Sequence, residues 1–390
     1  MEYSRQTLER RLQLSRQLTS AYTRSGEFVD LQFSGPGRRL QIPFPDQLAP
    51  VPSTAAVRDP ALPLPAADVV VLTYTSDEGK ALADVMTPGR FAQDWNAYTN
   101  NYAKFLPAIR RGAPARQAGR LGNYWTTRMG THEVLVFKST LHMHQDFIMQ
   151  NGHPTLPISE LFRQIIQQVQ PKYFFCIGTA GGTLLDKPLG TVAMSRALKF
   201  DCKKNFANEP YAKQAAPYTS NWNVSLQHRA TALALMKPFA SNLVIQSDGT
   251  FATCPCARLR QQEGHAPDVF FLVTGQDGIP ASLPVLTTDY FEFGTDKNGL
   301  QNDGIAVEMD DAVLGFVTST MSHPPSWARA SGTTRTPPLT GRSPSGRRRT
   351  APRTSICTTA IGRRFWGRLR RGALSQDYEG PVSPIYKPQS

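Results

Sequence analysis

The fold of this chain is decided by the stretch Pro171-Lys172-Tyr173-Phe174-Phe175-Cys176-Ile177-Gly178-Thr179-Ala180-Gly181-Gly182. Its apolar part, residues 173–177, predicts a short buried strand. The strand runs directly into Gly178 and then into the pair Gly181-Gly182. Because glycine has no Cβ, the backbone there can turn sharply and bring its N–H groups close to a ligand. Taken alone, the pattern predicts only a strand and a turn.

Two further segments follow in order, Thr287-Thr288-Asp289-Tyr290-Phe291 and Val307-Glu308-Met309-Asp310-Asp311-Ala312. Together with the first stretch they resemble the nucleoside phosphorylase and nucleosidase superfamily, whose members cleave the N-glycosidic bond of nucleosides. The resemblance spans residues 66–320. It departs from the family pattern at Gly190-Thr191-Val192, where a Gly-Asp-Val is usual. Each motif alone is weak, and the specificity comes from their order.

The pattern along residues 67–320 alternates between strands and helices, and several of the strands are continuously apolar. We expect strands at 68–74, 133–138, 172–177, 191–197, 242–246, 268–273, 284–288 and 304–308. We expect helices at 77–86, 91–105, 157–169, 225–237 and 309–320. Such alternation predicts a three-layer α/β/α fold. The family resemblance implies that its central sheet is mixed.

Charge and the content of proline and glycine together divide the chain into three parts. The net charge is +13, but +12 of it falls in residues 322–371, which hold twelve arginines and no acidic residue. We therefore expect an N-terminal helix and a Pro/Gly-rich arm over 1–65, a nearly neutral domain over 66–321, and a basic tail over 322–390. The tail is rich in Arg, Pro, Ser, Thr and Gly, a composition that cannot build a packed core.

The resemblance implies that Asp310 grips the ribose hydroxyls, since family members place a carboxylate after this methionine. A charged acceptor makes the stronger hydrogen bonds. The alternative is an acid that complements a helix N-terminus, which suits Glu308 and Asp311 better. The resemblance also places Met309 against the sugar and Phe291 against the base, and ordinary core packing is the alternative for both residues.

The same resemblance places Thr179, Ala180 and Gly181 along the ligand cleft, at the carboxyl end of a strand, where open α/β sheets bind ligands. Glu78 matches the position where nucleosidases activate water, although an exposed acid at a helix N-terminus is an equal alternative. Phosphorylases carry an arginine in the region that here reads 137–144, and no arginine stands there. Hydrolysis is therefore favoured over phosphorolysis, with phosphate kept as an alternative co-substrate.

No cofactor and no metal site are predicted. His142 and His144 would face one side of an extended segment, but a metal site needs a third ligand and none is identifiable.

The family's proton donor to the leaving purine, an Asp in a Val-Arg-x-x-Ser-Asp segment, is missing, because no acidic residue occurs between Asp311 and Asp377. Synonymous codons for Ala-Ser-Gly-Thr-Thr-Arg-Thr-Pro, read two bases later, give Val-Arg-Asn-Asp-Ser-Asp-Pro. We therefore expect a reading-frame shift near residues 327–330, with a genuine disordered tail as the alternative.

Three functions follow from this reading. The first is cleavage of purine nucleosides, impaired in the chain as written, and the second is a non-catalytic nucleoside-binding module on the same fold. The third, nucleic-acid binding through the tail, lacks interleaved aromatic residues and any known motif. Neither an apolar leader nor a run long enough for a membrane span is present, and five cysteines lack zinc spacing. A cytoplasmic protein with a nucleoside ligand, no membrane partner and no specific nucleic-acid partner is expected, and the family pattern implies a homo-oligomer.

Overall fold

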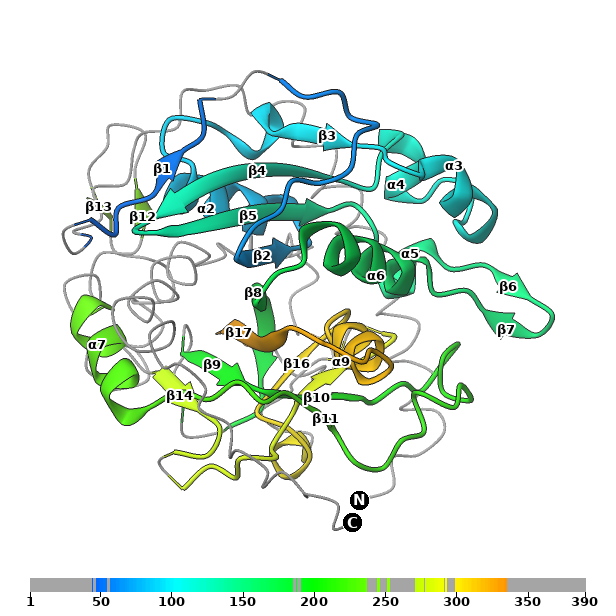
Figure 1. Ribbon diagram of the computed structural model, residues 1–390. Helices are drawn as coiled ribbons and strands as arrows, with labels where there is room; N and C mark the ends of the chain where they lie inside the picture. Colours follow the sequence, from blue (N-terminus) through cyan, green and yellow to red (C-terminus); the bar gives the residue numbers. More distant parts are fainter. Residues whose placement is uncertain are drawn as a thin grey trace, which may run out of the picture.

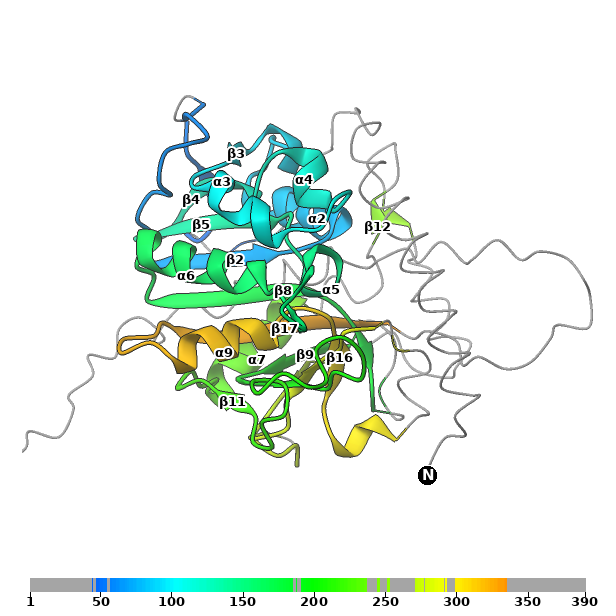
Figure 2. The same ribbon diagram turned by 90° about the vertical axis from the view of Figure 1, so that its right-hand side faces the viewer.

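The computed structural model describes residues 44, 47–54, 57–184, 187, 191–236, 244–245, 251–252, 271–276, 278–290, 292 and 299–334. Within these residues a 13-stranded mixed sheet carries helices on both faces (Figures 1 and 2). Its main path runs β1 (Val51–Pro52), β4 (Gly122–Met129), β5 (His132–Ser139), β2 (Val69–Thr73), β8 (Tyr173–Gly182), β16 (Ala306–Glu308), β15 (Val285–Thr287), β10 (Ala197–Phe200) and β11 (Tyr218–Thr219). The strands off this path are β3 (Asn96–Tyr98), β9 (Val192–Ser195), β14 (Phe271–Val273) and β17 (Ser326–Thr334).

Strand β8 is the centre of the sheet and has three neighbours. Its first part pairs in parallel with β2 on one side and with β17 on the other. Its last residues, Gly181 and Gly182, pair antiparallel with β16. The strand therefore connects the β2–β5 half of the sheet to the β16–β15–β10 half, and its glycine-rich end lies where the two halves meet.

Helices cover both faces because alternate residues of the central strands point in opposite directions. On one face Val70 and Phe174 pack with α6 (Pro157–Val169) and α9 (Ala312–Ser319), which lie side by side. On the other face Val71 and Phe175 pack with α2 (Ser76–Met86), and α7 (Leu226–Met236) adds to the same core. The α/β/α layers expected from the sequence are confirmed.

The remaining short elements surround these layers. They are α3 (Tyr102–Phe105), α4 (Pro114–Ala118), α5 (Met143–Asp146), the hairpin β6 (Met149–Gln150) and β7 (His153–Pro154), and the separate pair β12 (Val244–Ile245) and β13 (Phe251–Ala252). A 3-10 turn (Ala92–Asp94), β3 and α3 replace the single helix that was expected at 91–105. That prediction is wrong, because Trp95 and Tyr98 are buried beside β4 and the chain between them is extended. Asn101, in the left-handed region at φ 59°, then turns the chain before α3.

The expected domain boundary at 321/322 lies too early. Strand β17 begins at Ser326, and its residues lie between β8 and β9, with Trp327 and Ala328 buried. A strand between two others in a sheet is part of the core, so residues 326–334 belong to the fold. Residues 335–390, most of the expected basic tail, lie outside the described residues, as do residues 1–43, which include the expected N-terminal helix. Part of the expected arm, β1, pairs with β4.

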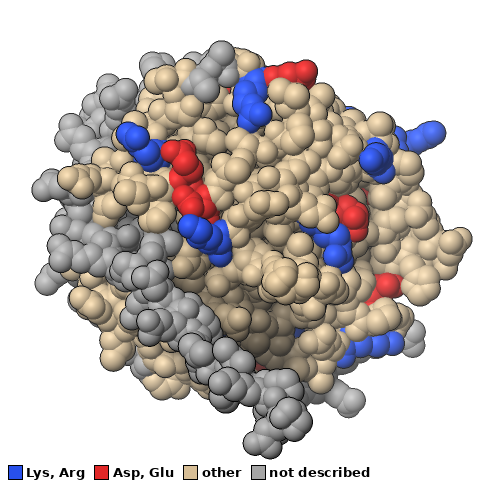
Figure 3. All heavy atoms as spheres, viewed as in Figure 1, with Lys and Arg blue, Asp and Glu red and all other residues tan. Residues whose placement is uncertain are grey.

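Charged side chains on the face shown in Figure 3 are scattered, and several Lys and Arg lie close to Asp or Glu. The described residues on this face therefore form no continuous basic patch of the kind that binds nucleic acids. Among the described residues, we find no helix with the length and apolarity needed to cross a lipid bilayer.

Candidate functional site

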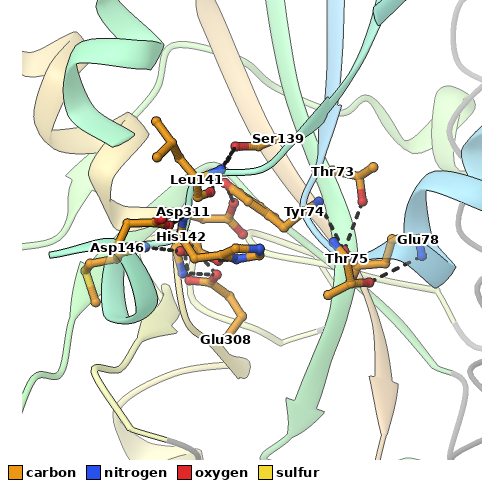
Figure 4. A network of polar contacts seen from close by, with 12 residues as sticks. Thr73, Tyr74, Thr75, Glu78, Ser139, Leu141, His142, Asp146, Glu308 and Asp311 are labelled. Carbon is orange, nitrogen blue, oxygen red and sulfur yellow. Dashed lines mark hydrogen bonds and ion pairs between the residues drawn. The ribbon is translucent and has the colours of Figure 1, made fainter. Parts of the chain in front are cut away.

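The candidate site lies at the carboxyl ends of β2, β5 and β8. These three strands are parallel neighbours, so the segments that follow them meet at one edge of the sheet. Figure 4 shows the two polar groups that result: Glu78 with the β2–α2 loop, and His142 with the acidic segment that follows β16.

Glu78 is buried, with 5% of its surface exposed, although it lies in the first turn of α2. One carboxylate oxygen accepts hydrogen bonds from the Thr73 hydroxyl (2.9 Å) and from two backbone N–H groups of the β2–α2 loop. The other accepts from the N–H and the hydroxyl of Thr179, at 2.6 and 2.8 Å. Of the alternative interpretation, an exposed acid at a helix N-terminus, only the exposure is wrong: Glu78 closes a capping box with Thr75 and also joins α2 to β8.

Gly178 does not turn the chain in the way that the sequence pattern predicted, because β8 continues through it to Gly182. A Cβ at this position would lie 2.7 Å from Oε1 of Glu78 and 2.9 Å from Nη2 of Arg329. Both charged groups therefore occupy the space next to the Gly178 Cα that a side chain would fill. Any residue other than glycine would push the Glu78 carboxylate and the Arg329 guanidinium away. Next along β8, Thr179 and Gly181 are half-buried and Ala180 is buried.

Asp310 follows β16, the strand that pairs with Gly181 and Gly182 of β8, and 5% of its surface is exposed. It accepts hydrogen bonds from the Met143 N–H (2.7 Å) and from Nδ1 of His142 (3.1 Å). Burial opposes ionisation, but the charge and hydrogen bond of His142 outweigh it, so the pKa of Asp310 lies below its ordinary value. The bond also orients His142, whose ring lies 6.0 Å from that of Tyr74.

Glu308 and Asp311 do not share one role, contrary to the sequence interpretation. Glu308 accepts from the N–H groups of Asp310 (2.6 Å) and Asp311 (3.0 Å) and from the Thr287 hydroxyl, so it does complement the start of α9. Asp311 makes no side-chain cap. Burial, together with the nearby charge of Asp311, raises the pKa of Glu308 well above its ordinary value.

Arg329 is a charged residue beside the candidate site that the sequence interpretation missed. It lies on β17, where a disordered tail was expected, and its Nη1 lies 2.6 Å from Oδ2 of Asp311, with both side chains buried. Burial alone would lower the pKa of Arg329, but neighbouring carboxylates, that of Asp311 first, raise it. An arginine that stands alone among apolar strand residues would have been the sequence signal.

The other predicted ligand contacts are partly described. Met309 is half-buried between Glu308 and Asp310, and Phe291 lies outside the described residues. His142 and His144 are close, with ring centroids 6.2 Å apart. Among the described residues, no three His, Cys, Asp or Glu side chains come together in a way that could hold a metal ion.

No protein-family model matches the chain, and no curated protein matches it either. Solved structures do. MTAN of Helicobacter pylori is 12% identical over 68% of this chain and 88% of its own, with a TM-score of 0.36. A 5'-methylthioadenosine/S-adenosyl homocysteine nucleosidase of Campylobacter jejuni is 11% identical over 71% and 89%, with a TM-score of 0.38.

A uridine phosphorylase of the oomycete Phytophthora capsici is 13% identical over 79% of this chain and 90% of its own, with a TM-score of 0.45. The likeness is one of fold. What the site can do follows from its own side chains.

Proposed function

We propose that the chain is built to cleave the N-glycosidic bond of a nucleoside by hydrolysis. One observation carries the proposal. Glu78 is fixed by five hydrogen-bond donors at the carboxyl end of the central strands, beside the glycine-rich end of β8. A carboxylate held in this way has one orientation, which is what a general base that activates water requires.

The rest of the site supplies the other contacts that this reaction needs. Asp310, with His142, provides a polar grip for the ribose hydroxyls as the sugar gains positive charge. The family resemblance further implies that Thr179, Ala180 and Gly181 line the ligand cleft, that Met309 packs on the sugar and that the aromatic ring at position 291 stacks on the base. Stacking of this kind contributes about 1–3 kcal/mol. Phosphorylases carry an arginine in the region that here reads 137–144, and its absence from those residues favours water over phosphate as the acceptor.

We propose further that the activity of the chain as written is low. Proton donation to the leaving purine needs an acid, and between Asp311 and Asp377 the sequence has none. General acid catalysis contributes about 10²–10⁴-fold in rate. The missing acid favours one second candidate, a nucleoside-binding module that keeps the pocket and has lost the chemistry.

Product analysis tests both candidates. The chain is incubated with adenosine and with inosine, with and without phosphate, and the free base is measured. We expect slow base release that does not depend on phosphate and that Glu78→Gln reduces by about 10²–10⁴-fold. Glu160→Gln, the same change at an exposed helix position, is the matched control. Release that requires phosphate would indicate a phosphorylase, and binding without release would indicate the binding module.

A cytoplasmic location and a homo-oligomeric state are part of the same proposal. The two cysteines in the described part of the chain, Cys176 and Cys202, are free thiols, as is usual in a reducing compartment. Cell fractionation tests the location, and sedimentation of the purified chain tests the oligomeric state.

A further inference from the structure

Asp311 occupies an unusual position for an acid at the start of a helix. Its side chain has no exposed surface and turns away from the N–H groups of α9. It accepts a hydrogen bond from the Tyr74 hydroxyl at 2.6 Å and forms the 2.6 Å ion pair with Arg329. One carboxylate thus joins three separate segments: the end of β2, the start of α9 and β17.

Arg329 connects Asp311 to Glu78 through Thr179 and Gly178. The guanidinium of Arg329 also donates to the Thr179 carbonyl (3.4 Å) and to the Ser331 hydroxyl (2.7 Å). Thr179 is the residue whose N–H and hydroxyl hold Glu78. Arg329 and Glu78 both reach the bare face of Gly178, so the guanidinium and the carboxylate are close neighbours.

Tyr74 connects Asp311 to Glu78 a second time and also contacts His142. The Tyr74 N–H donates to Glu78 at 3.3 Å, and its ring lies beside that of His142 (Figure 4). The Tyr74 phenol is held in this position because its hydroxyl donates a hydrogen bond to Asp311. Both routes start at one carboxylate and end at the group that would activate water.

The buried guanidinium of Arg329 determines how the site responds when Asp311 is removed. Arg329 cannot give up its proton, and breaking a buried ion pair leaves an uncompensated charge in a medium of low dielectric constant. Without Asp311, the guanidinium would be drawn to the carboxylates that remain nearby, those of Glu78 and Glu308. Glu78 would then be held by Arg329 in place of its present donors.

We propose that Asp311 is a positioning residue of the candidate site, which holds Arg329 and Tyr74 in place and so leaves Glu78 oriented toward the ligand. The proposal rests on the proposed function for its catalytic consequence. Its structural part, the coupling of Asp311 to Glu78 through Arg329, is independent of that function.

A double-mutant cycle on stability tests the coupling. The urea midpoints of unfolding are measured for the full chain, Asp311→Asn, Glu78→Gln and the double variant. Because Asp311→Asn is isosteric, the cycle does not depend on a cavity-forming change. We expect Glu78→Gln to lower the midpoint more in the Asp311→Asn background than in the parent, since Arg329 then depends on Glu78.

Glu209→Gln is the matched control, because Glu209 is a buried carboxylate that pairs with His153, outside the candidate site. Its effect should add to that of Asp311→Asn. Equal losses from Glu78→Gln in the two backgrounds would overturn the proposal whatever the chain's activity proves to be. If the parent neither binds nor cleaves a nucleoside, the proposed function fails and the cycle still decides the coupling.

Kinetics test the catalytic consequence. With adenosine or inosine as substrate, Asp311→Asn should lower kcat roughly 10²-fold, the loss typical of a misplacement of about 1 Å, with little change in KM. Arg329→Lys should keep more activity than Arg329→Met, because it keeps a cation between the carboxylates. A rise in KM at unchanged kcat would show that Asp311 serves binding alone and would overturn the positioning role.

Discussion

At the scale of the residue, Gly178 sets how closely the two charged groups of the site approach the backbone. A methyl group at this position would meet Glu78 Oε1 at 2.7 Å and Arg329 Nη2 at 2.9 Å. We expect Gly178→Ala to lower the free energy of unfolding by about 1–3 kcal/mol, the usual cost of overpacking, and to weaken nucleoside binding. Urea unfolding and calorimetric titration with adenosine measure the two effects. An alanine variant that matches the parent in both would mean that the groups do not meet at this glycine.

His144 makes stability depend on pH. Burial, with the nearby charges of His142, Arg110 and Lys204, lowers the pKa of His144 from 6.5 to about 4, against the opposing charge of Asp310. Between pH 6.5 and 4 the unfolded chain therefore binds a proton that the folded chain does not, so this residue makes stability fall as pH falls.

The loss from His144 is at most about 3 kcal/mol, because one pKa unit is worth 1.36 kcal/mol and the side chain is partly exposed. We expect His144→Asn to flatten the fall in unfolding free energy between pH 6.5 and 4, measured by urea titration at each pH. Glu308 acts in the opposite direction, since its raised pKa makes stability fall as pH rises. An unchanged slope in His144→Asn would assign the acid sensitivity to other groups.

At the scale of the element, strands and helices with a strong local pattern could be predicted from the sequence. The expected helices at 77–86 and 157–169 correspond to α2 and α6, and the expected strand at 172–177 corresponds to the first part of β8. Strand β4 was missed, because Asn123, Thr126 and Thr127 interrupt its apolar pattern. Its stability comes from pairing along its whole length with β5, which no local pattern reports.

Strand β17 was missed for a different reason. Its sequence, Ser-Trp-Ala-Arg-Ala-Ser-Gly-Thr-Thr, begins an arginine-rich region and was assigned to the tail. The structure supplies what the sequence could not, a buried partner for Arg329, the carboxylate of Asp311 just before α9. Because the residues from Trp327 to Arg329 suit their buried positions, we propose that the change of reading frame begins at Ala330. Sequencing the gene through codons 320–370 tests this.

Truncation tests the place of β17 in the fold. A chain that ends at residue 334 keeps the strand between β8 and β9, and we expect it to be soluble and to unfold cooperatively. A chain that ends at residue 325 exposes the unpaired edges of both strands, and we expect it to aggregate. Soluble yield and circular dichroism on heating compare the two. Equal behaviour would mean that β17 contributes nothing to the core.

At the scale of the whole molecule, the site brings together segments that are far apart in the chain. The Thr179–Glu78 contact spans 101 positions, His142–Asp310 spans 168 and Tyr74–Asp311 spans 237. The family resemblance could indicate Glu78 and Asp310 one at a time. It could not indicate that Asp310 holds a histidine or that Asp311 faces an arginine, because only the sheet topology creates those contacts.

The absent acid gives a prediction for the whole chain. A variant re-read after Arg329 to carry Val-Arg-Asn-Asp-Ser-Asp-Pro should cleave nucleosides about 10²–10⁴-fold faster than the chain as written, since it regains a proton donor for the leaving purine. Base release from inosine at equal protein concentration measures the ratio, and soluble yield should rise with it. Equal rates would refute both the frame shift and the missing acid.

The place of β17 in the middle of the sheet has a consequence for synthesis on the ribosome. Strands β8 and β9 leave the ribosome well over a hundred residues before the strand that joins them. At about 5–20 residues per second, they wait for several seconds with their facing edges open. Asp311 is made before its partner Arg329, so the acidic segment must stay hydrated until then. The site therefore forms only when nearly all of the folded part has been made.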